Sequence, residues 1–434
     1  MRIAQITPSA GDSFYCENCL RDVALVAAMR KSGHDVLMIP LYLPLPIGES
    51  GSAGNASAIF FGGINVYLQQ KSGFFRRTPR WLDRLFDSPA LLRWVGRKAG
   101  MTSARDLGES TISMLSGENG KQAKELNRLL EWLDTQENKP DVVCLSNVLL
   151  AGLARAIKQR LGVPVVCLLQ DEDGFLDGLP SPYSERAWQI LSERTGDVNA
   201  FIAVSKYYAD VMRQRLGLHP DQIYAVYTGI SLDGYEADQA GPQIPTIGYL
   251  SRMCYDKGLD TLVEAFVKLK QNQKLRNARL RIAGGKRVDD ETFLDQIRQR
   301  LSSRGLMDDV AFLPDFGGSA RLAFLRTTSV LSVPEKQPVA YGLYVLEALA
   351  AGVPVVQPAS GVFPELLEMT GGGVLCEPNN AEALAAAMEP LLLKPHYARQ
   401  LGKQGKDAVF EKFNIEQTVE EMVRIYGKIV QQLV

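Results

Sequence analysis

The sequence predicts an α/β protein made of two doubly wound, Rossmann-type domains that face a central cleft. Three observations favour this fold class. Short, continuously apolar runs alternate with segments of helical periodicity in two separate stretches of the chain. Residues 236–244, EADQAGPQI, contain Pro, Gly and polar residues without periodicity, as a linker does. The length of 434 residues suits two domains of ordinary size, each with its own core.

The composition is that of a globular protein and argues against several classes. Apolar residues make up 46% and charged residues 22%, and the net charge of −1 argues against a global nucleic-acid binder. The apolar run at the start of the chain is too short for a signal peptide. The sequence contains no run of about 18 apolar residues, so no membrane span is predicted. The six cysteines are too scattered for a disulfide framework. A cytoplasmic protein is therefore expected.

The first domain is expected over residues 1–236, and it begins with a strand, a helix and a second strand. The strands are expected at residues 2–6 and 35–42, and the helix at residues 20–31, ended by Gly33. This helix is expected to bury one stripe of small and apolar side chains: Leu20, Val23, Ala24 and Ala27. The turn after the first strand lacks the G-x-G-x-x-G fingerprint of dinucleotide-binding proteins.

Cys16 and Cys19 form a C-x-x-C pair in the first loop. A zinc site needs four ligands, and the chain has no second C-x-x-C pair and only three histidines. Two interpretations remain. The cysteines form a redox pair, or they pack the loop, and the packing interpretation is favoured.

Residues 43–135 interrupt the alternation of strands and helices. Within them, residues 71–105 hold nine Lys or Arg and two Asp, which gives this segment a charge of +7. One helical face of the segment is apolar and aromatic: Trp81, Leu82, Leu85 and Phe86. Such a helix suits an anionic membrane surface or an amphiphilic acceptor. An ordinary helix packed on its own domain shows the same pattern and is the favoured alternative.

The alternation resumes at residue 141 and leads to a cluster of carboxylates. Strands are expected at residues 141–145 and 163–169, and the second opens onto Gln170-Asp171-Glu172-Asp173. Side chains at the carboxyl end of a parallel strand stand where open sheets bind ligands, although a solvated loop is the alternative. Glu172 and Asp173 are the candidate catalytic residues of this cluster. The other elements expected here are helices at 149–160 and 206–216 and strands at 201–204 and 223–227.

The second domain is expected over residues 244–410. Its strands are predicted at residues 245–250, 279–283, 310–313 and 330–333. Its helices are predicted at residues 258–270, 289–301 and 322–326. Three further helices close the chain at residues 381–393, 397–410 and 415–434, and residues 411–434 are expected to cross back to the first domain.

Residues 333–368 are predicted to form the phosphate-binding part of this domain. A polar loop ends at Gly342, a helix begins at Leu343, and Gly352 stops it. A buried strand follows at residues 353–356, and Pro364 marks the start of another helix. Two helix N-termini then face the same side of a parallel sheet, where their unpaired amides favour an anion.

Two cations are predicted to converge on the same anion. Arg252 and Lys257 bracket the turn between the strand at 245–250 and the helix at 258–270. An arginine supplies a bidentate fork and a lysine a point charge, and both suit phosphate near a helix N-terminus.

Several motifs in the second half resemble those of the retaining glycosyltransferases of family 4, which have the GT-B fold. The donor-sugar signature of that family is similar to Tyr341-Gly342-Leu343, Glu347-Ala348 and the strand Gly352-Val353-Pro354-Val355-Val356. The family's arginine, four residues, lysine-glycine motif is matched by Arg252, Lys257 and Gly258. Shorter matches are residues 202–205, 229–231 and 283–285.

The resemblance implies transfer of a sugar from a nucleoside-diphosphate sugar, with no other cofactor and no metal. Arg252 and Lys257 would hold the diphosphate as the glycosidic bond breaks, and Glu347 would accept hydrogen bonds from the ribose. The donor would also lie against Tyr341 and the amides near Gly342 and Leu343, while Gly11 would let the first loop approach it closely. The expected partners are the sugar nucleotide and a saccharide or lipid-linked acceptor.

Two positions depart from the family pattern. Val339 stands where the first signature glutamate is expected, and Glu335, four residues upstream, is the nearest substitute. No histidine follows the strand at 163–169. Alternative functions are a sugar-nucleotide epimerase or phosphorylase on the same fold, or a protein that binds the nucleotide sugar without transfer. The nucleobase, sugar and acceptor are not indicated by the sequence.

Overall fold

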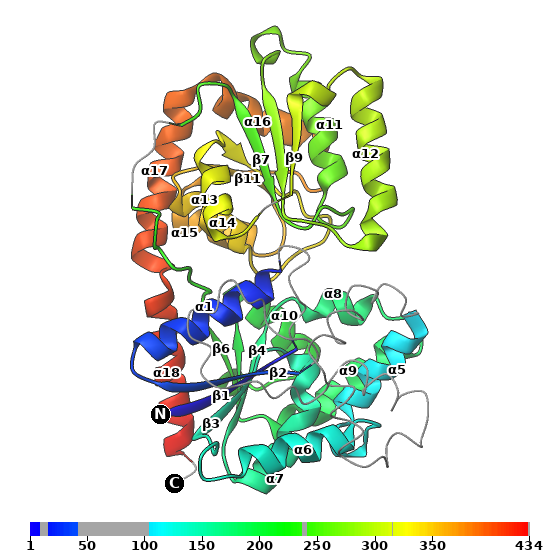
Figure 1. The fold of residues 1–434 in the computed structure, drawn as a ribbon, viewed down its shortest axis with the longest axis vertical. Helices are drawn as coiled ribbons and strands as arrows, with labels where there is room; N and C mark the ends of the chain where they lie inside the picture. Colours follow the sequence, from blue (N-terminus) through cyan, green and yellow to red (C-terminus); the bar gives the residue numbers. More distant parts are fainter. Residues whose placement is uncertain (9–15, 42–103, 237–240, 315, 433–434) are drawn as a thin grey trace. The chain divides into compact units, whose positions relative to one another are not determined.

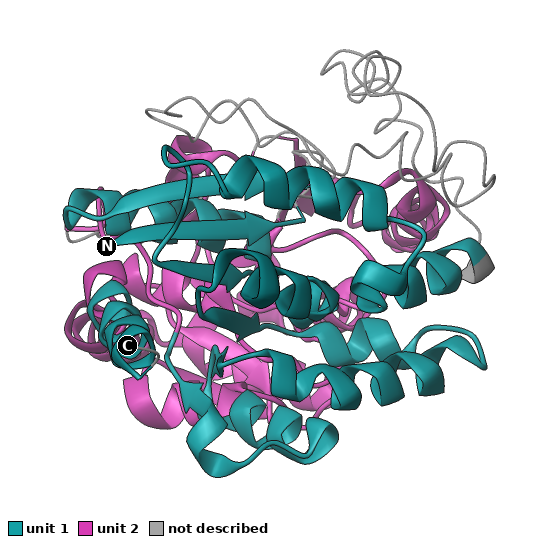
Figure 2. Cartoon of the chain, turned by 90° about the horizontal axis from the view of Figure 1, so that it is seen from below, with its two compact units in different colours: residues 1–12, 18–227, 418–434 teal, residues 13–17, 228–417 magenta. Residues whose placement is uncertain are grey.

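The computed structural model describes residues 1–8, 16–41, 104–236, 241–314 and 316–432. They form two compact units, each of which is described by itself. Unit 1 comprises residues 1–12, 18–227 and 418–434, and unit 2 comprises residues 13–17 and 228–417 (Figure 2). Residue 11 and residues 42–103 lie outside the described residues, and so do the predictions made for Gly11 and for most of the segment 71–105.

Unit 1 is built on a parallel six-stranded sheet with the order β2-β1-β3-β4-β5-β6 (Figure 1). Its strands are β1 (Arg2–Thr7), β2 (Asp35–Pro40), β3 (Val142–Leu145), β4 (Val165–Leu169), β5 (Ala200–Ala203) and β6 (Ile223–Ala225). Every residue of β3, β4 and β5 is buried, as expected for strands covered on both faces by helices. The strand order reverses direction beside β1, as in a doubly wound sheet.

The helices of unit 1 come from both ends of the chain. They are, from residue 18 on, α1 (Glu17–Lys31), then α5 (Ala104–Leu115), α6 (Ala123–Leu133), α7 (Ala154–Leu161), α8 (Glu172–Asp177), α9 (Tyr183–Arg194), α10 (Lys206–Leu216) and, from residue 418 on, α18 (Ile415–Gln431). A 3₁₀ segment, η4 (Val148–Leu153), precedes α7 where the sequence predicted one continuous helix. The predicted loop after β4 is a short helix, α8.

The buried face predicted for α1 is wrong. Ala27 is exposed, and the helix instead buries Arg21 and Asp22 together with apolar residues such as Leu25 and Met29. Arg21 Nη2 lies 2.5 Å from Asp22 Oδ1, and Asp22 Oδ2 accepts a hydrogen bond from Thr7 at 2.9 Å. This ion pair satisfies two charges inside the unit, and hydrophobic periodicity alone could not foresee it.

Unit 2 repeats the architecture with the strand order β12-β11-β10-β7-β8-β9 (Figure 1). Its strands are β7 (Thr246–Leu250), β8 (Arg279–Ala283), β9 (Val310–Leu313), β10 (Val330–Leu331), β11 (Val355–Pro358) and β12 (Gly373–Cys376), all parallel. Its helices are α11 (Leu259–Leu269), α12 (Glu291–Ser303), α13 (Gly318–Arg326), α14 (Leu343–Ala350), α15 (Phe363–Thr370), α16 (Ala381–Leu393) and α17 (Pro395–Lys412).

The end of α14 explains why the next strand starts later than predicted. Gly352 has φ +73°, its amide donates to Leu349 O, and the Val353 amide donates to Ala348 O. This pair of bonds is a Schellman motif, which satisfies the last carbonyls of the helix. The motif continues through residue 353, so β11 begins at Val355 rather than at Val353.

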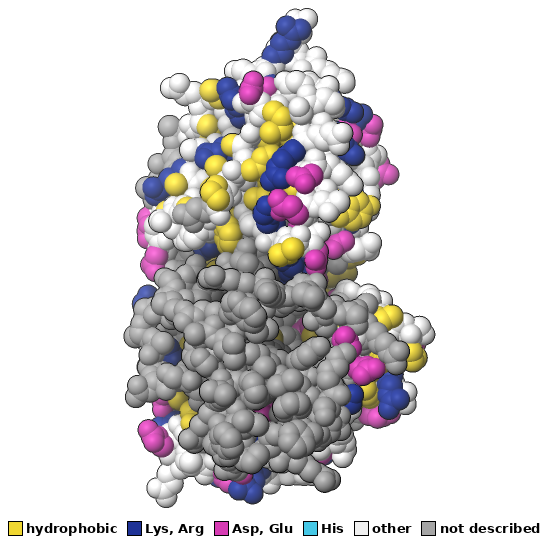
Figure 3. Space-filling model, turned by 45° about the vertical axis from the view of Figure 1, so that its right-hand side comes forward, with side chains coloured by type: hydrophobic (Ala, Val, Ile, Leu, Met, Phe, Trp, Pro, Cys, Tyr) yellow, Lys and Arg dark blue, Asp and Glu magenta, His cyan; other side chains and the backbone are white. Residues whose placement is uncertain are grey.

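Charges of both signs are interspersed on the described surface. On the face in Figure 3, Lys and Arg side chains of unit 2 lie beside Asp, Glu and hydrophobic side chains. Among the described residues, no helix is both long and apolar enough to span a bilayer.

Candidate functional site

Three loops meet at the carboxyl edge of the unit 2 sheet. They follow β7, β8 and β10, and two glycines let them touch. Gly258 has φ +68°, and a Cβ atom there would lie 1.8 Å from Pro334 O. Gly284 has φ +127°, and a Cβ atom there would lie 2.1 Å from Ser251 O. No larger residue fits either position, so the backbone itself brings Arg252, between these contacts, close to the loop that follows β10.

Arg252 is held by a buried carboxylate. Its Nε and Nη2 atoms donate to Asp290 Oδ2 and Oδ1 at 2.8 and 2.7 Å. The Asp290 side chain is 7% exposed and also accepts a hydrogen bond from the Arg287 amide at 2.7 Å. Burial acts to lower the pKa of Arg252, but the pairing with Asp290 raises it, and the net shift is upward. The bidentate pair uses one edge of the guanidinium and fixes its plane.

Lys257 is held in the same way by Glu335. Its Nζ atom donates to Glu335 Oε1 at 2.8 Å, and Tyr344 OH donates to the same oxygen at 3.0 Å. Glu335 is only 2% exposed, and burial followed by the charge of Glu335 raises the pKa of Tyr344 well above its usual value. Glu335 is therefore the partner of Lys257.

Val339 is buried where that glutamate was expected. It is 6% exposed, and its carbonyl accepts a hydrogen bond from the Val362 amide at 3.0 Å. Gly361 packs against it, because a Cβ atom at Gly361 would lie 2.5 Å from Val339 N. The loop from 334 to 342 is therefore fixed by its backbone, with an apolar side chain at position 339.

Glu347 lies inside unit 2 rather than on a solvated helix surface. It is 5% exposed within α14, all of whose residues are buried. Arg321 Nε, from α13, lies 3.0 Å from Glu347 Oε1 as an ion pair. Tyr235 is close by, since burial and then the charge of Glu347 raise its pKa.

The other predicted residues of unit 2 lie at the start of α14 and just before it. Tyr341 is 6% exposed, and Gly342 is the N-cap residue, which supplies no capping side chain. The Leu343 amide donates to Glu17 Oε1 at 2.6 Å, and Glu17 belongs to unit 2 by its contacts. A carboxylate thus sits at this helix N-terminus, as the helix dipole favours.

In unit 1, Glu172 and Asp173 converge on one tyrosine. Tyr208 OH lies 3.0 Å from Glu172 Oε2 and 3.0 Å from Asp173 Oδ1. Glu172 also accepts hydrogen bonds from the amides of Val148 at 3.1 Å and Gln170 at 2.6 Å. Burial raises the pKa of Glu172 to about 7, against the lowering effect of these bonds. Glu172 is 4% exposed, whereas Asp173 is half-buried.

The structure thus places six predicted residues in unit 2 and two in unit 1, and in unit 2 Glu335 links Lys257 to Tyr344 of α14. Those in unit 2 are Arg252, Lys257, Tyr341, Gly342, Leu343 and Glu347. Sequence reasoning missed the residues that hold them, Asp290, Arg321 and Tyr208. Asp290 follows a glycine pair, Gly284-Gly285, after β8, which was a usable signal, but nothing in the sequence links Arg321 to Glu347.

The cysteines and acidic residues give no metal site in the described part of the chain. None of the six cysteines, all of which lie in that part, forms a disulfide, and Cys16 is partly exposed whereas Cys19 is buried. No group of three or more His, Cys, Asp or Glu side chains in that part could hold a metal ion.

Comparison with known proteins matches both halves of the chain. The model of "Glycosyl transferases group 1" matches residues 238–408, and that of "Glycosyltransferase Family 4" matches residues 108–233. An uncharacterized glycosyltransferase of Methanocaldococcus jannaschii is 26% identical over 70% of this chain and 79% of its own length. The human alpha-1,3/1,6-mannosyltransferase ALG2 is 24% identical over 61% of this chain and 66% of its own length.

Solved structures share the fold. Sucrose-phosphate synthase from Thermosynechococcus elongatus superposes with a TM-score of 0.72 at 18% identity, over 99% of each chain. HepE of Anabaena, in complex with UDP, superposes with a TM-score of 0.65 at 14% identity, over 99% of this chain and 100% of its own.

The two parallel sheets and these matches define a glycosyltransferase of the GT-B fold. Within that class, the chain belongs to the family 4-like glycosyltransferases. The predicted family, fold class and enzyme type are thereby confirmed, and the alternative functions are not favoured.

Proposed function

We propose that the protein transfers a sugar, with retention of configuration, from a nucleoside-diphosphate sugar to a saccharide or lipid-linked acceptor. The observation that carries this proposal is the placement of Arg252 and Lys257 at the carboxyl edge of a doubly wound sheet, each oriented by a buried carboxylate. Ligands of open α/β sheets bind at this edge.

The two cations would neutralise the diphosphate as it departs. Arg252 pairs with Asp290 through Nε and Nη2, and a phosphate oxygen would approach the guanidinium from the Nη1 side. Lys257 Nζ has three donors and gives one to Glu335. Fixed donors aimed at developing charge lower the barrier, because they need little reorganisation during the reaction.

The remaining donor contacts come from α14 and its N-cap residue. Glu347 would accept hydrogen bonds from the ribose, and the amide of Gly342 would face phosphate or sugar. The Leu343 amide would do so only after it releases Glu17, to which it donates at 2.6 Å. Structures of Anabaena HepE, which shares the fold, contain UDP and UDP-glucose. A sugar nucleotide is the ligand we propose here by that analogy, without a choice of base.

Glu172 and Asp173 divide the role that the sequence assigned to both. Glu172 is buried and saturated with hydrogen bonds, so it would position Tyr208 and Asp173 rather than meet a substrate. Asp173 is the more exposed carboxylate and would accept a hydrogen bond from an acceptor hydroxyl.

Charge-balanced double variants test the diphosphate site. Lys257→Ala alone would strand the buried Glu335 carboxylate, so Lys257→Ala is combined with Glu335→Gln, and Arg252→Ala with Asp290→Asn. A thermal-shift screen of common nucleoside-diphosphate sugars first selects the donor. Each pair is then expected to lose about 1.5–3 kcal/mol of nucleotide affinity relative to its single variant, Glu335→Gln or Asp290→Asn, with an unchanged circular dichroism spectrum. Unchanged titrations in both pairs would refute the site, and NMR of the product anomer tests retention.

The segment 71–105 is proposed to contact the acceptor or an anionic membrane from the cytoplasmic side. Its charge of +7 in a chain of net charge −1 supports this, although its structure lies outside the described residues. Each basic residue near an anionic bilayer contributes about 1 kcal/mol, and salt weakens the effect. Sedimentation with anionic vesicles at low and high salt tests it, and protein that stays in the supernatant at low salt excludes the membrane.

A further inference from the structure

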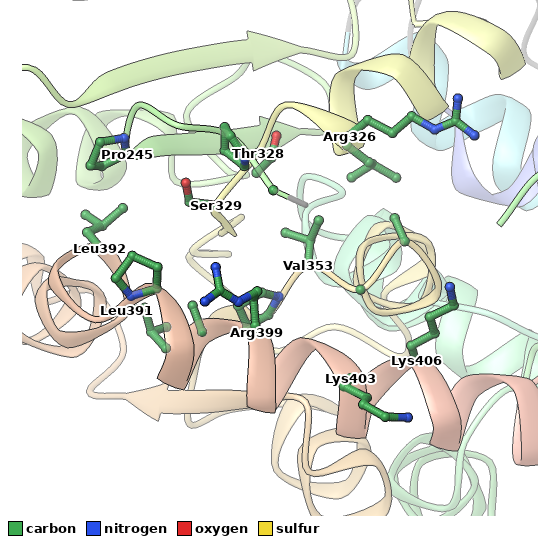
Figure 4. Close-up of a pocket in the computed structure, with 18 of the residues that line it drawn as sticks. Pro245, Arg326, Thr328, Ser329, Val353, Leu391, Leu392, Arg399, Lys403 and Lys406 are labelled. Atoms are coloured by element: carbon green, nitrogen blue, oxygen red, sulfur yellow. The ribbon is translucent and has the colours of Figure 1, made fainter. Parts of the chain in front are cut away.

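A cavity of about 450 Å³ lies at the amino edge of the unit 2 sheet, opposite the candidate site (Figure 4). Residues that precede three strands line it: Pro245 before β7, Thr328 and Ser329 before β10, and Val353 before β11. The five residues of β7 separate this edge from Arg252 by about 17 Å. The volume is within the usual range for a small-ligand site, about 300–1,000 Å³. The cavity is therefore a separate feature of unit 2.

One wall of the cavity is held firmly in place by a close contact between two glycines. A Cβ atom at Gly402, in α17, would lie 2.0 Å from Gly352 O, so α17 touches the backbone just after α14. Leu391 and Leu392, at the end of α16, are buried beside it. Because this packing leaves no room for adjustment, α17 cannot move inward to fill the cavity.

The lining of the cavity combines apolar side chains with polar donors. Figure 4 shows Arg399 between Leu391 and Val353, on the side opposite Thr328 and Ser329. The Ser329 hydroxyl accepts a hydrogen bond from the Thr246 amide at 3.0 Å, which leaves its own proton to donate. Ser329 and the exposed Arg399 thus face a space that is also lined by the apolar side chains of Leu391, Leu392 and Val353.

The charge of the lining favours an anion. Its charged residues are four cations and two carboxylates, for a net charge of +2: Arg326, Arg399, Lys403, Lys406, Glu236 and Asp407. Asp407 is already paired with Lys403 at 2.8 Å. Within the described residues, neither guanidinium has a carboxylate partner, and Arg326 donates only to the Gly234 carbonyl at 3.3 Å. A phosphate is the group that best matches an arginine fork.

We infer that this cavity binds an amphipathic phosphate, with its phosphate on Arg399 and Ser329 and its apolar body against Leu391, Leu392 and Val353. Burial of the apolar body supplies affinity, and the arginine selects the head group. A lipid phosphate and a soluble alkyl phosphate share this chemistry. The site is independent of the proposed donor site and of the activity of the enzyme.

Titration calorimetry with three probes separates the contribution of the phosphate group from that of the apolar body. The probes are octyl phosphate, inorganic phosphate and 1-octanol. One molecule of octyl phosphate is expected to bind per chain. Inorganic phosphate and 1-octanol are each expected to bind at least about tenfold more weakly, because each lacks half of the contacts. Inorganic phosphate that binds as tightly as octyl phosphate would refute the amphipathic site, and so would octyl phosphate that does not bind. Phosphatidic acid in vesicles, compared with phosphatidylcholine alone, then distinguishes a lipid from a soluble ligand.

Variants locate the binding. Arg399→Ala and Ser329→Ala are expected to weaken the binding of octyl phosphate, the first by about tenfold or more. Arg276→Ala, at an exposed position, is the matched control and should leave this binding unchanged. Arg252→Ala combined with Asp290→Asn should leave the affinity for octyl phosphate unchanged. If the Arg252→Ala and Asp290→Asn double variant loses octyl phosphate binding while Arg399→Ala does not, the ligand binds at the donor site and the inference is overturned.

Discussion

Replacing Glu335 by glutamine should tighten the binding of a nucleoside diphosphate. The substitution keeps the shape of the side chain and an oxygen for Lys257 and Tyr344, which donate to Glu335 at 2.8 and 3.0 Å. It removes a negative charge from directly beneath the proposed diphosphate site. A buried carboxylate there competes with phosphate for the same ammonium group.

The magnitude follows from the geometry. A phosphate oxygen about 2.8 Å from Nζ, on another N–H of the tetrahedral ammonium group, would lie about 4.6 Å from the carboxylate oxygen, where unit charges repel by about 3.6 kcal/mol at an effective dielectric constant of 20. The side chain of Lys257 is 23% exposed, so water screens part of this repulsion. The affinity is therefore expected to rise about tenfold, or about 1.4 kcal/mol. Product inhibition by the nucleoside diphosphate should rise with it.

Calorimetric titration with the nucleoside diphosphate selected by thermal shift measures this effect. The gain should be larger at low salt than at high salt, because the change is electrostatic. Glu411→Gln, at an exposed position of α17, is the matched control and should change nothing. Weaker binding in a variant with the thermal stability of the original protein would refute the reasoning, because it would mean that Glu335 mainly orients Lys257.

Three other predictions concern packing, protonation and metal. Gly258→Ala is expected to lower the free energy of unfolding, since the new methyl group would meet Pro334 O in a left-handed backbone, and chemical denaturation measures the loss. Glu172 has a pKa raised to about 7 in the folded protein, above its unfolded value of 4.5, so the folded state holds the extra proton and stability falls as pH rises between these values. Glu172→Gln should reduce this loss of stability, measured as the difference in the free energy of unfolding between pH 5 and pH 7.5 by chemical denaturation. If the difference is the same in the variant as in the original protein, another group is responsible. Transfer should survive EDTA, because Arg252 and Lys257 supply the countercharge, whereas activity lost to EDTA and restored by manganese would point to a different mechanism.

The sequence by itself determined the architecture and most of the site in unit 2. Parallel strands buried on both faces read as continuous apolar runs, so the six strands of each sheet could be found from composition and periodicity, apart from β12. Gly352 predicted the end of α14 because a Schellman motif needs a left-handed residue. Arg252 and Lys257 were identified because their spacing brackets a strand–helix turn.

Only the tertiary structure decided what those residues touch. Asp290 and Glu335 pair with Arg252 and Lys257 across loops that follow different strands, and Arg321 reaches Glu347 from a neighbouring helix. Contacts of this kind depend on which strands are neighbours in the sheet, and the order β12-β11-β10-β7-β8-β9 is not written in any local pattern.

The same limit explains the error in α1 and the missed cavity. Periodicity assumes that the buried face of a helix is apolar, but α1 turns Arg21 and Asp22 inward because each satisfies the other. The cavity gathers residues that precede β7, β10 and β11 with residues of α16 and α17, more than 150 residues apart at the extremes. Local sequence fixes an element through short-range sterics and burial, whereas a site made of several elements exists only after long-range packing has placed them together.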